Sequence, residues 1–582
     1  MKIILGINAY HGDSSACLVI DGKLMNAIEE ERINRIKHWA GLPIESIKWC
    51  LSDANINIKD VDYIAISRNP YAHFHKKIIR AITKIPTLSF LKNRFSNVNR
   101  IKDIKNDILS AFDVEKSLIK AKVEYVEHHR AHIGSSFFVS PFEEAACITV
   151  DGFGDFVSTM RGIGKDNQIQ IYDWVEFPHS LGDFYTAFTQ YLGFWNYGDE
   201  YKVMGLSAYG KPVYLEQLRK IVKLKKNGLF ELDTSYFQHN KGGVEMYWDN
   251  GNPVFGKTFS DKFVEIFGKP RDKNEEITEQ HQNIASSVQA IYEEVFFHIL
   301  NDAYKKTKIE NLALAGGCIQ NSLANGKIVK QTPFKNIYIP PASYDAGTAI
   351  GAAMVVWHTK YNQPRKFVMK HAYLGPAFSK EEIEIEISKH SLKEKGYSVE
   401  FIKDETILYQ KTAKYIEEGK IIGWFQGRTE FGPRALGNRS TLVDPRRKEM
   451  KDILNERIKR REWFRPFAPS ILEEKVSEWF DQSSAVPFME KVYKIKYEKQ
   501  RLIPAVCHID GTGRLQTVSL NTNPRYYNLI KQFENITQVP IVLNTSFNDN
   551  EPIVNTPKDA IECFLSTKMD VLVLEDFLIK KE

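Results

Sequence analysis

A short arrangement of strands and turns occurs twice in this chain, and no other feature of the sequence limits its possible folds as strongly. In the first copy, largely apolar segments expected to be strands run from 2 to 7 and from 16 to 20 on either side of a polar turn. The pair Asp21-Gly22 is typical of a two-residue hairpin turn, and a third apolar run follows at 24–28. We therefore expect three strands that are joined by tight turns.

The second copy has strands expected at 145–150, 156–163 and 169–174, with a glycine-rich turn at 151–155 and another turn at 164–167. Two units of this kind, each continuing into helix and strand, build folds similar to actin and hexokinase, in which a phosphate or metal site lies between the hairpin turns. The predicted fold class is therefore α/β, with a duplicated N-terminal domain. Such a fold does not by itself decide the activity.

The size and composition of the chain fit a protein with several packed cores. The chain has 582 residues, of which 43% are hydrophobic. Its six cysteines lie far apart, which argues against a zinc ribbon or a disulfide framework, and no apolar run reaches the ~18–20 residues of a membrane span. We expect a cytoplasmic protein that does not contact membranes, with a homodimer as one assembly to consider.

The net charge of the chain is small, but its basic residues gather in particular segments. The net charge of +6 is small for 582 residues, so nucleic acid is not an expected partner. Lysines and arginines gather between Lys76 and Lys105, interspersed with apolar residues. This stretch has two interpretations: a solvated helical insertion, which we favour, and an arm that binds a polyanion.

A change in composition near residue 370 marks the expected domain boundary. Residues 361–366 have the polar, proline-containing composition of a linker, and the charge density changes beyond it. We place one domain at 1–370, with halves of about 1–144 and 145–360, and a second domain at 371–582.

Two histidines and two aspartates form a candidate metal site. His128 and His132 are four residues apart, which places both imidazoles on one face of a helix. Taken alone, this spacing is more often found in histidines with structural hydrogen bonds. Asp151 follows a predicted strand and Asp345 precedes a helix rich in small residues, so both should face the same cleft. Such ligands suit a divalent transition metal that keeps positions open for phosphate or substrate oxygens.

Glycines near these residues predict phosphate binding, because they let backbone N–H groups approach phosphate closely. Such glycines also occur in ordinary turns. The candidates are Gly152, Gly154, Gly316, Gly317 and Gly347. In the first turn of the first copy, His11 is placed to take a proton from an attacking hydroxyl, or to stabilise the turn.

The C-terminal part contains a dense basic motif at 427–440, in which arginines are flanked by glycine and proline. Guanidinium groups in such turns are suited to bind phosphate or carboxylate oxygens. Further basic, hydroxyl and amide side chains follow along the chain. The candidates for a second polyanion site are Arg434, Arg439, Lys459, Arg514, Ser546 and Asn548.

Five segments carry a resemblance to a known family. They are VEHHRAH at 126–132, YKVMGLSAYG at 201–210, LAGG at 314–317, DAG at 345–347 and FGPRALG at 431–437. Along essentially its whole length, the chain resembles the O-carbamoyltransferases of antibiotic, cephem and nodulation-factor biosynthesis. The resemblance implies an N-terminal domain similar to the tRNA threonylcarbamoyl transferase proteins and a C-terminal α/β domain similar to the threonylcarbamoyl-adenylate synthases.

The resemblance also implies two half-reactions. In the C-terminal site, carbamoyl phosphate and ATP, with Mg²⁺, would give carbamoyl-adenylate, and the matching residues are Lys459, Arg514, Ser546 and Asn548, joined by Arg434. In the N-terminal site, the carbamoyl group would pass to a hydroxyl of a small natural-product or sugar-like acceptor. There the matching metal ligands, usually of iron(II), are His128, His132, Asp151 and Asp345; His11 matches the base, and Asn321 belongs to the loop near the nucleotide.

Two other functions stay open at this point. A threonylcarbamoyl-type modification of tRNA requires a continuous basic face, for which the stretch from Lys76 to Lys105 is the candidate. A non-catalytic nucleotide-binding regulator would bind ATP and transfer nothing. The presence of all four candidate metal ligands, together with the arginines, favours the transferase.

Overall fold

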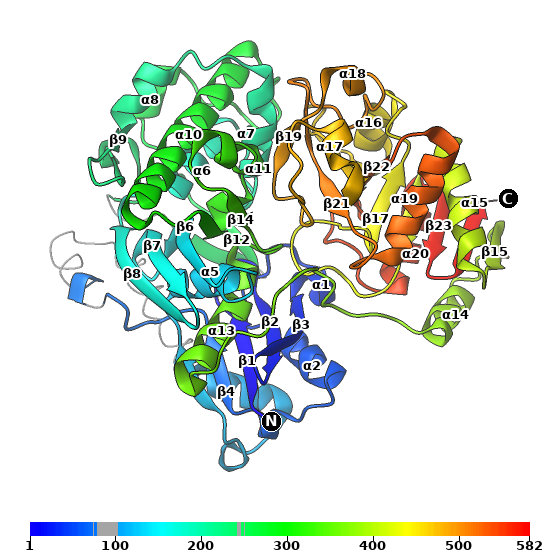
Figure 1. Cartoon of the computed structure of the whole chain (residues 1–582), viewed down its shortest axis with the longest axis horizontal. Helices are drawn as coiled ribbons and strands as arrows, with labels where there is room; N and C mark the ends of the chain where they lie inside the picture. Colours follow the sequence, from blue (N-terminus) through cyan, green and yellow to red (C-terminus); the bar gives the residue numbers. More distant parts are fainter. Residues whose placement is uncertain (74, 78–102, 241–245, 250, 582) are drawn as a thin grey trace. The chain divides into compact units, whose positions relative to one another are not determined.

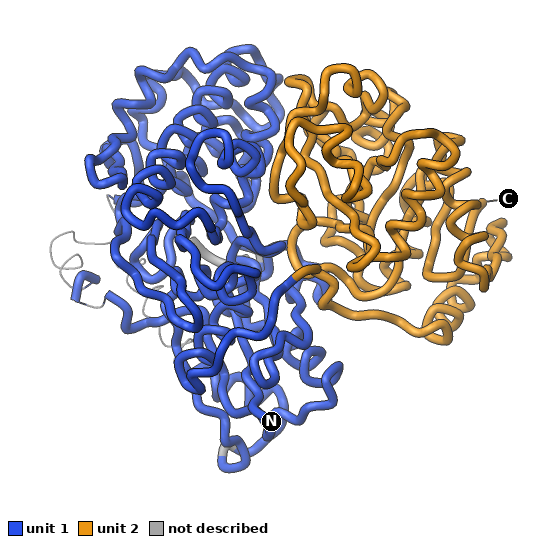
Figure 2. Tube along the Cα trace, viewed as in Figure 1, with its two compact units in different colours: residues 1–369 blue, residues 370–582 orange. Residues whose placement is uncertain are grey.

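The computed structural model describes residues 1–73, 75–77, 103–240, 246–249 and 251–581 (Figure 1). The chain divides into two compact units, residues 1–369 and 370–582 (Figure 2). Each unit has its own buried hydrophobic core. Most of the basic stretch between Lys76 and Lys105 lies outside the described residues.

The first sheet of unit 1 is built from the first predicted copy. Asp21 and Gly22 both have positive φ, 48° and 80°, as expected for a type I′ hairpin turn. The hairpin strands pair antiparallel, and two further strands add in parallel. The order is β3 (Lys23–Glu29), β2 (Ser15–Ile20), β1 (Ile3–Asn8), β4 (Tyr63–Ile66) and β5 (Lys122–Tyr125).

The second sheet of unit 1 repeats this topology, with a meander of antiparallel strands followed by parallel additions on its other side. The order is β8 (Gln168–Glu176), β7 (Val157–Lys165), β6 (Glu144–Gly154), β13 (Asn311–Ala315) and β14 (Asn336–Tyr338). Strand for strand, this order matches that of the first sheet. The predicted α/β fold with a duplicated N-terminal part is confirmed.

Two helices join the sheets of unit 1. α5 (His128–Phe137) packs on β6 and β13, α13 (Thr348–Tyr361) packs on β1, and the two helices pack against each other. Where they cross, a Cβ atom on Gly351 would lie 1.7 Å from the carbonyl oxygen of Ala131, so only glycine fits. The small residues that precede and form α13 therefore permit a close helix contact at the centre of the unit.

Further short elements and one long helix complete unit 1. The helices are α1 (Glu31–Asn34), α2 (Ile44–Asp53), α6 (Leu181–Tyr191), α7 (Glu200–Leu206), α8 (Leu215–Ile221), α9 (Lys262–Phe267), α10 (Glu279–Thr307), α11 (Ser322–Asn325) and α12 (Ile328–Gln331). Two small hairpins pair β9 (Val222–Leu224) with β10 (Phe230–Leu232) and β11 (Met246–Asp249) with β12 (Asn252–Phe255).

The segment predicted to be a linker packs on unit 1. Arg365 donates hydrogen bonds to the main-chain oxygens of Phe138, Ser140 and Phe142, and its guanidinium lies 4.3 Å from the ring centre of Phe137. Arg365 therefore anchors this segment of linker-like composition to unit 1. The segment is polar because it satisfies main-chain oxygens that follow α5.

Unit 2 is built on one mixed sheet. The order is β15 (Tyr397–Phe401), β24 (Phe577–Lys581), β23 (Val571–Leu574), β16 (Ile422–Phe425), β17 (Arg439–Val443), β22 (Ile541–Ser546), β18 (Ala468–Leu472) and β21 (Gln516–Val518). A separate pair joins β19 (Val492–Lys494) to β20 (Thr512–Arg514). The predicted α/β class of the C-terminal part is confirmed.

Helices accompany the sheet of unit 2. They are α14 (Lys380–Lys389), α15 (Glu405–Glu417), α16 (Met450–Ile453), α17 (Val476–Trp479), α18 (Tyr497–Gln500), α19 (Pro524–Thr537) and α20 (Pro557–Ser566). α16 continues directly into a π-helical turn, Leu454–Lys459. Among the helices of the described residues, none is long and apolar enough to cross a membrane.

Candidate functional site

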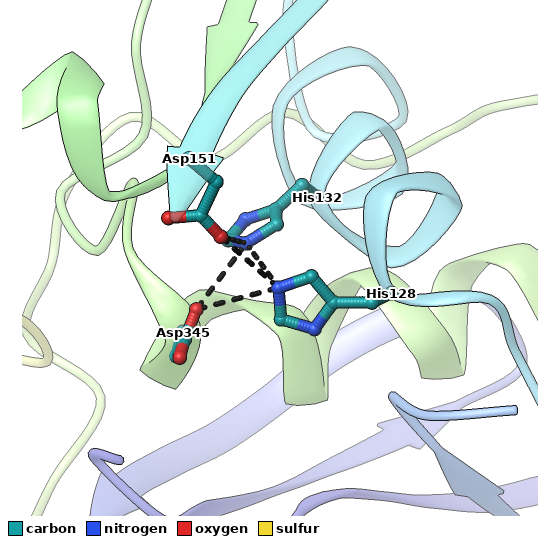
Figure 3. Close-up of side chains that lie close together, drawn as sticks. All are labelled: His128, His132, Asp151 and Asp345. Carbon is teal, nitrogen blue, oxygen red and sulfur yellow. Dashed lines mark hydrogen bonds and ion pairs between the residues drawn. The ribbon is translucent and has the colours of Figure 1, made fainter. Parts of the chain in front are cut away.

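Four buried side chains of unit 1 meet at one point (Figure 3). His128 and His132 lie on α5, Asp151 on β6, and Asp345 in the short 3-10 helix Asp345–Gly347 that precedes α13. The two histidine Nε2 atoms are 3.1 Å apart, and each lies 3.1 Å from Asp151 Oδ2. Asp345 Oδ1 lies 3.5 Å from His128 Nε2 and 3.4 Å from His132 Nε2.

These distances fit the coordination shell of a metal ion. Ligand atoms at about 2.1 Å from an ion lie about 3.0 Å apart at right angles and about 3.4 Å apart at the tetrahedral angle. Each histidine Nε2 atom here has three close neighbours, whereas a single N–H hydrogen is directed at one acceptor. Two imidazoles and two carboxylates are a donor set for a divalent transition metal. We call His128, His132, Asp151 and Asp345 the metal-ligand cluster.

The charges within the metal-ligand cluster depend on one another. Burial lowers the pKa of His132, but its hydrogen bonds to Asp151 and Asp345 outweigh burial and raise the pKa to about 9. Burial raises the pKa of Asp151, but His128 and His132 outweigh it and hold the pKa well below its usual range. The cluster therefore keeps its carboxylate negative and favours a cation at its centre.

Neighbouring residues position the side chains of the metal-ligand cluster. The Glu127 side chain accepts the N–H of Arg130 at 2.8 Å and so caps the start of α5. A Cβ atom on Gly154 would lie 1.9 Å from Cδ2 of His128, so the absence of a side chain there makes room for the imidazole. Gly317 donates its N–H to Asp151 Oδ1 at 2.9 Å, which leaves Oδ2 directed at the histidines.

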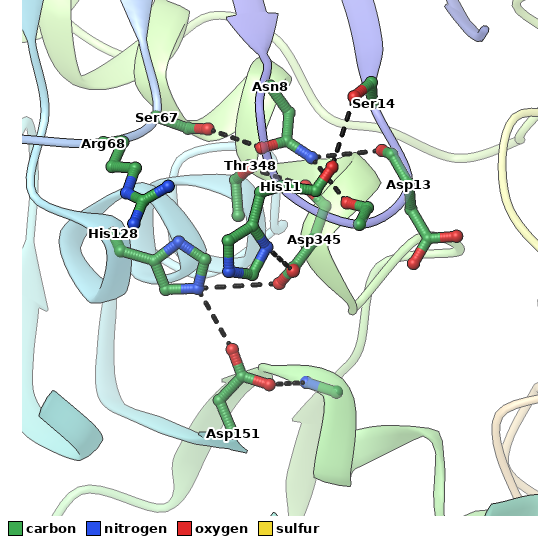
Figure 4. Close-up of polar contacts among 12 residues, drawn as sticks. Asn8, His11, Asp13, Ser14, Ser67, Arg68, His128, Asp151, Asp345 and Thr348 are labelled. Carbon is green, nitrogen blue, oxygen red and sulfur yellow. Dashed lines mark hydrogen bonds and ion pairs between the residues drawn. The ribbon is translucent and has the colours of Figure 1, made fainter. Parts of the chain in front are cut away.

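His11 lies beside the metal-ligand cluster, in the turn between β1 and β2 (Figure 4). Its Nδ1 forms an ion pair with Asp345 Oδ2, and its ring centre is 5.3 Å from that of His128. Burial lowers the pKa of His11, but Asp345 outweighs burial and raises it above the usual value of 6.5. Asn8 donates to the oxygens of Gly12 and Asp13 at 3.0 and 3.1 Å, which fixes the turn.

The predicted phosphate-binding glycines have different surroundings. A Cβ atom would lie 2.2 Å from the Val150 oxygen at Gly316 and 1.9 Å from the Ala342 oxygen at Gly347, so these two glycines are required by packing. The N–H of Gly317 is already bonded to Asp151. At Gly152 a Cβ atom would meet only Asp183 Oδ1, at 3.8 Å, so this position is open.

Asn321, predicted to lie near the cofactor, has its hydrogen bonds within the protein. Its Oδ1 accepts the N–H of Ala324 at 3.1 Å and caps α11, and its side-chain amide pairs with that of Gln289 at 2.9 and 3.1 Å. No sequence motif indicated Gln289, which comes from α10. In the structure Asn321 therefore fixes the loop after β13.

In unit 2 the structure brings together three of the predicted residues. Lys459 is 3% exposed and ends the π-helical turn. Its Nζ donates to Asn548 Oδ1 at 2.7 Å, to the Asn548 main-chain oxygen at 2.8 Å and to Ser546. The Ser546 hydroxyl in turn donates to Asn548 Oδ1 at 2.8 Å. A buried ammonium group is thus held at the end of β22, with hydroxyl and amide groups around it.

Arg514, at the end of β20, lies among other guanidinium groups. Burial lowers its pKa strongly, and the positive charges of Arg434, Arg461 and Arg465 lower it further. Its Nε is buried without a hydrogen-bond partner, and no ion pair joins Arg514 to any residue that the structure describes. We call these four residues the arginine cluster. Clustered guanidinium groups of this kind are stabilised by a polyanion.

Arg439 has a different place from the one predicted. It is fully buried, and its guanidinium donates to the main-chain oxygens of Gln426, Gly427, Asn438, Asn555 and Pro376. The same group stacks on Phe425, 3.6 Å from the ring centre. Because main-chain oxygens take its donors, Arg439 supports the loop that carries Arg434 and does not join the arginine cluster.

Sequence reasoning missed residues that have no local motif. Arg68 follows β4 and lies near His11, and Asp155 accepts the main-chain N–H of His128 at 3.0 Å. Asp13, Glu31 and His38 form a second group whose candidate ligand atoms all lie within 4.8 Å of one another. These residues come together only through contacts between segments that are distant in the sequence, and such contacts cannot be predicted from the spacing of residues along the chain.

The fold and the site together define a duplicated α/β protein with a metal-ligand cluster between its two copies and an arginine cluster in its second unit. The family model of the carbamoyltransferase N-terminus matches residues 3–354, and that of the carbamoyltransferase C-terminus matches residues 413–581. The chain therefore belongs to the carbamoyltransferase family, as its sequence motifs indicate, and is an enzyme of that kind.

Relatives match over most of their length. An uncharacterized protein of Synechocystis sp. is 40% identical over 100% of this chain and 97% of its own. The nodulation protein NolNO of Sinorhizobium fredii is 36% identical over 99% of this chain and 80% of its own, and the nodulation protein NolO of Bradyrhizobium diazoefficiens is 39% identical over 78% and 79%. Among solved structures, HypF of T. kodakarensis matches with a TM-score of 0.30 and 12% identity over 62% of this chain and 48% of its own.

Proposed function

We propose that this enzyme uses ATP to transfer the carbamoyl group of carbamoyl phosphate to a hydroxyl of a small acceptor, through carbamoyl-adenylate. The observation that carries the proposal is the presence of two chemically different sites. The arginine cluster with Lys459 suits the binding of phosphates, and the metal-ligand cluster with His11 suits a transfer to a hydroxyl.

The first half-reaction is assigned to unit 2. Carbamoyl phosphate and ATP are both polyanions, and the arginine cluster offers them four guanidinium groups. Hydrolysis of carbamoyl phosphate gives carbamate and phosphate, and a carbamate oxygen then attacks the α-phosphorus of ATP. The bond to the leaving group breaks, and pyrophosphate departs with a charge that arginines offset. Mg²⁺ would accompany ATP here.

The second half-reaction is assigned to unit 1. We propose iron(II) as the ion of the metal-ligand cluster; when bound, it supplies a Lewis acid next to the reacting group. His11 accepts the proton of the acceptor hydroxyl, and Asp345 orients its imidazole through Nδ1. The hydroxyl oxygen forms a bond to the carbamoyl carbon, the bond from this carbon to the phosphate oxygen breaks, and AMP leaves.

An exchange assay tests this division. In the presence of carbamoyl phosphate, the enzyme should exchange labelled pyrophosphate into ATP, and Arg514→Ala should abolish the exchange. His132→Ala should keep the exchange but lose the carbamoyl mass gain in a mass-spectrometric screen of hydroxylated acceptors. Arg501→Ala, at an exposed position of unit 2, is the matched control and should behave as the wild type. A wild-type enzyme that shows no exchange dependent on carbamoyl phosphate would contradict the proposal.

A further inference from the structure

We propose that Arg68 binds a phosphate oxygen of a nucleoside monophosphate group beside the metal-ligand cluster, through its Nη2 group. This inference rests on the proposed function, because that function brings an adenylate to unit 1. Arg68 lies two residues beyond the end of β4, outside every motif that the sequence offers.

The guanidinium of Arg68 is held on one side and open on the other. Nη1 donates to the main-chain oxygen of Tyr10 at 3.2 Å, and Nε lies 4.0 Å from Asp155 Oδ1. Nη2 has no hydrogen bond or ion pair to any residue that the structure describes. The side chain is 31% exposed, so a ligand can reach it. A fixed guanidinium with one open edge is suited to bind an anionic oxygen.

The guanidinium of Arg68 lies close to the groups that are assigned to the transfer. Figure 4 shows the guanidinium next to the rings of His11 and His128. The Nη1 group of Arg68 is bonded to the main-chain oxygen of Tyr10, the residue directly before His11. A phosphate bonded to Nη2 would therefore lie near both the base and the metal-ligand cluster.

The partners of Arg68 are the segments that build the site. Tyr10 directly precedes His11, and Asp155 accepts the main-chain N–H groups of His128 at 3.0 Å and Asn69 at 2.7 Å. Asp155 comes from the turn after β6, the strand that carries Asp151. Arg68 thus contacts both the turn of the first copy and the turn of the second, and these two contacts fix the position of its guanidinium.

The charge balance of the site explains why an arginine is useful there. Asp151, Asp345 and Asp155 surround the site with carboxylates, so a phosphate group needs positive charge in addition to a divalent ion. The charge on the phosphate increases when the carbamoyl group leaves it. A guanidinium fixed next to that oxygen stabilises the departing monophosphate more than the bound anhydride.

The test measures binding of AMP close to the metal-ligand cluster. Mn²⁺ is added as a paramagnetic ion, and the broadening of the ³¹P signal of AMP then reports AMP near that ion; His132→Ala gives the background without the site. Arg68→Gln should raise the dissociation constant of AMP about tenfold to a hundredfold, as expected for a lost charged hydrogen bond. Arg68→Lys should recover part of the affinity.

The control is Arg130→Gln, which removes an exposed arginine from the same helix as His128 and His132 and should leave AMP binding unchanged. The inference is overturned if Arg68→Gln binds AMP within about twofold of the wild type, well below the expected change. It is also overturned if the variant loses Mn²⁺ together with AMP, because the role of Arg68 is then structural. The Arg68→Gln variant should exchange pyrophosphate into ATP as the wild type does, because this half-reaction is assigned to unit 2. If the wild type itself shows no such exchange, that result counts against the proposed function and not against the role of Arg68.

Discussion

At the level of single residues, Gly152 and Gly154 of β6 differ in whether the structure leaves room for a side chain. A Cβ atom on Gly154 would lie 1.9 Å from the ring of His128, whereas one on Gly152 would meet Asp183 at 3.8 Å, an ordinary contact. We predict that Gly154→Ala displaces the imidazole and weakens metal binding at least about tenfold, because one of four ligands is lost. Gly152→Ala should bind metal as the wild type does.

Equilibrium dialysis with Mn²⁺, or metal analysis of the purified proteins, measures this difference. The circular dichroism spectrum shows whether each variant is folded. Equal metal content in the two alanine variants would mean that His128 does not need the space that Gly154 provides.

His38 offers a prediction on pH. Burial lowers its pKa, but the contact of Nδ1 with Asp13 at 2.7 Å outweighs burial and raises the pKa to about 9. A raised pKa means that the pair stabilises the fold fully below the usual value of 6.5, and that this stabilisation is lost as the pH rises through about 9. His38→Gln should therefore lower the melting temperature at pH 6 and have little effect at pH 9.5.

Differential scanning calorimetry at the two pH values checks this outcome. His298→Gln is the control, because His298 is on α10 and contacts a main-chain oxygen rather than a carboxylate. A drop in melting temperature that is as large at pH 9.5 as at pH 6 would contradict the prediction.

At the level of elements, the loop 431–437 depends on one buried carboxylate. Glu430 is 2% exposed, and its Oε1 accepts the N–H groups of Leu436 at 2.8 Å, Asn438 at 2.7 Å and Arg439 at 3.2 Å. Glu430→Ala leaves these buried donors without an acceptor, so we expect unit 2 to lose at least about 3 kcal/mol. Glu430→Gln keeps an acceptor oxygen and should lose less.

Urea unfolding, followed by hydrogen exchange of peptides from β17, measures the loss in unit 2. The pyrophosphate exchange should fall in the alanine variant, because Arg434 is carried by this loop. An alanine variant as stable as the wild type would show that other groups or water satisfy the three N–H groups.

The elements also show which predictions a sequence permits. The strands of both copies and the Asp21-Gly22 turn were predictable because their apolar pattern and turn residues are local. The metal-ligand cluster was predictable because residues four apart, such as His128 and His132, lie on the same face of a helix, and because its other members lie in or near family motifs. Arg439 was not, since its stacking on Phe425 and its main-chain partners come from segments far along the chain.

At the level of the whole molecule, each unit should respond to its own ligand. Each unit has a buried core of its own, so binding should stabilise mainly the unit that holds the site. A ligand at a hundred times its dissociation constant contributes about 2.7 kcal/mol to the folded state. We predict that Mn²⁺ slows hydrogen exchange in α5 and β6, whereas ATP slows it in the segments of the arginine cluster.

Mass spectrometry of deuterium uptake, with and without each ligand, resolves the two responses. Removal of the metal with a chelator should reverse the first response and leave the second. Protection of unit 2 segments by Mn²⁺ alone would contradict the assignment of the metal to unit 1.

The repeated sheet order has a consequence for how such a site can arise. His11 comes from the turn after the first strand of one copy and Asp151 from the corresponding strand of the other, and neither copy alone holds the full set of groups. A chain of half the length with this topology would have to pair with a second copy, and its activity would fall with dilution. Joining the two copies in one chain makes the pairing intramolecular, so the site persists at any protein concentration.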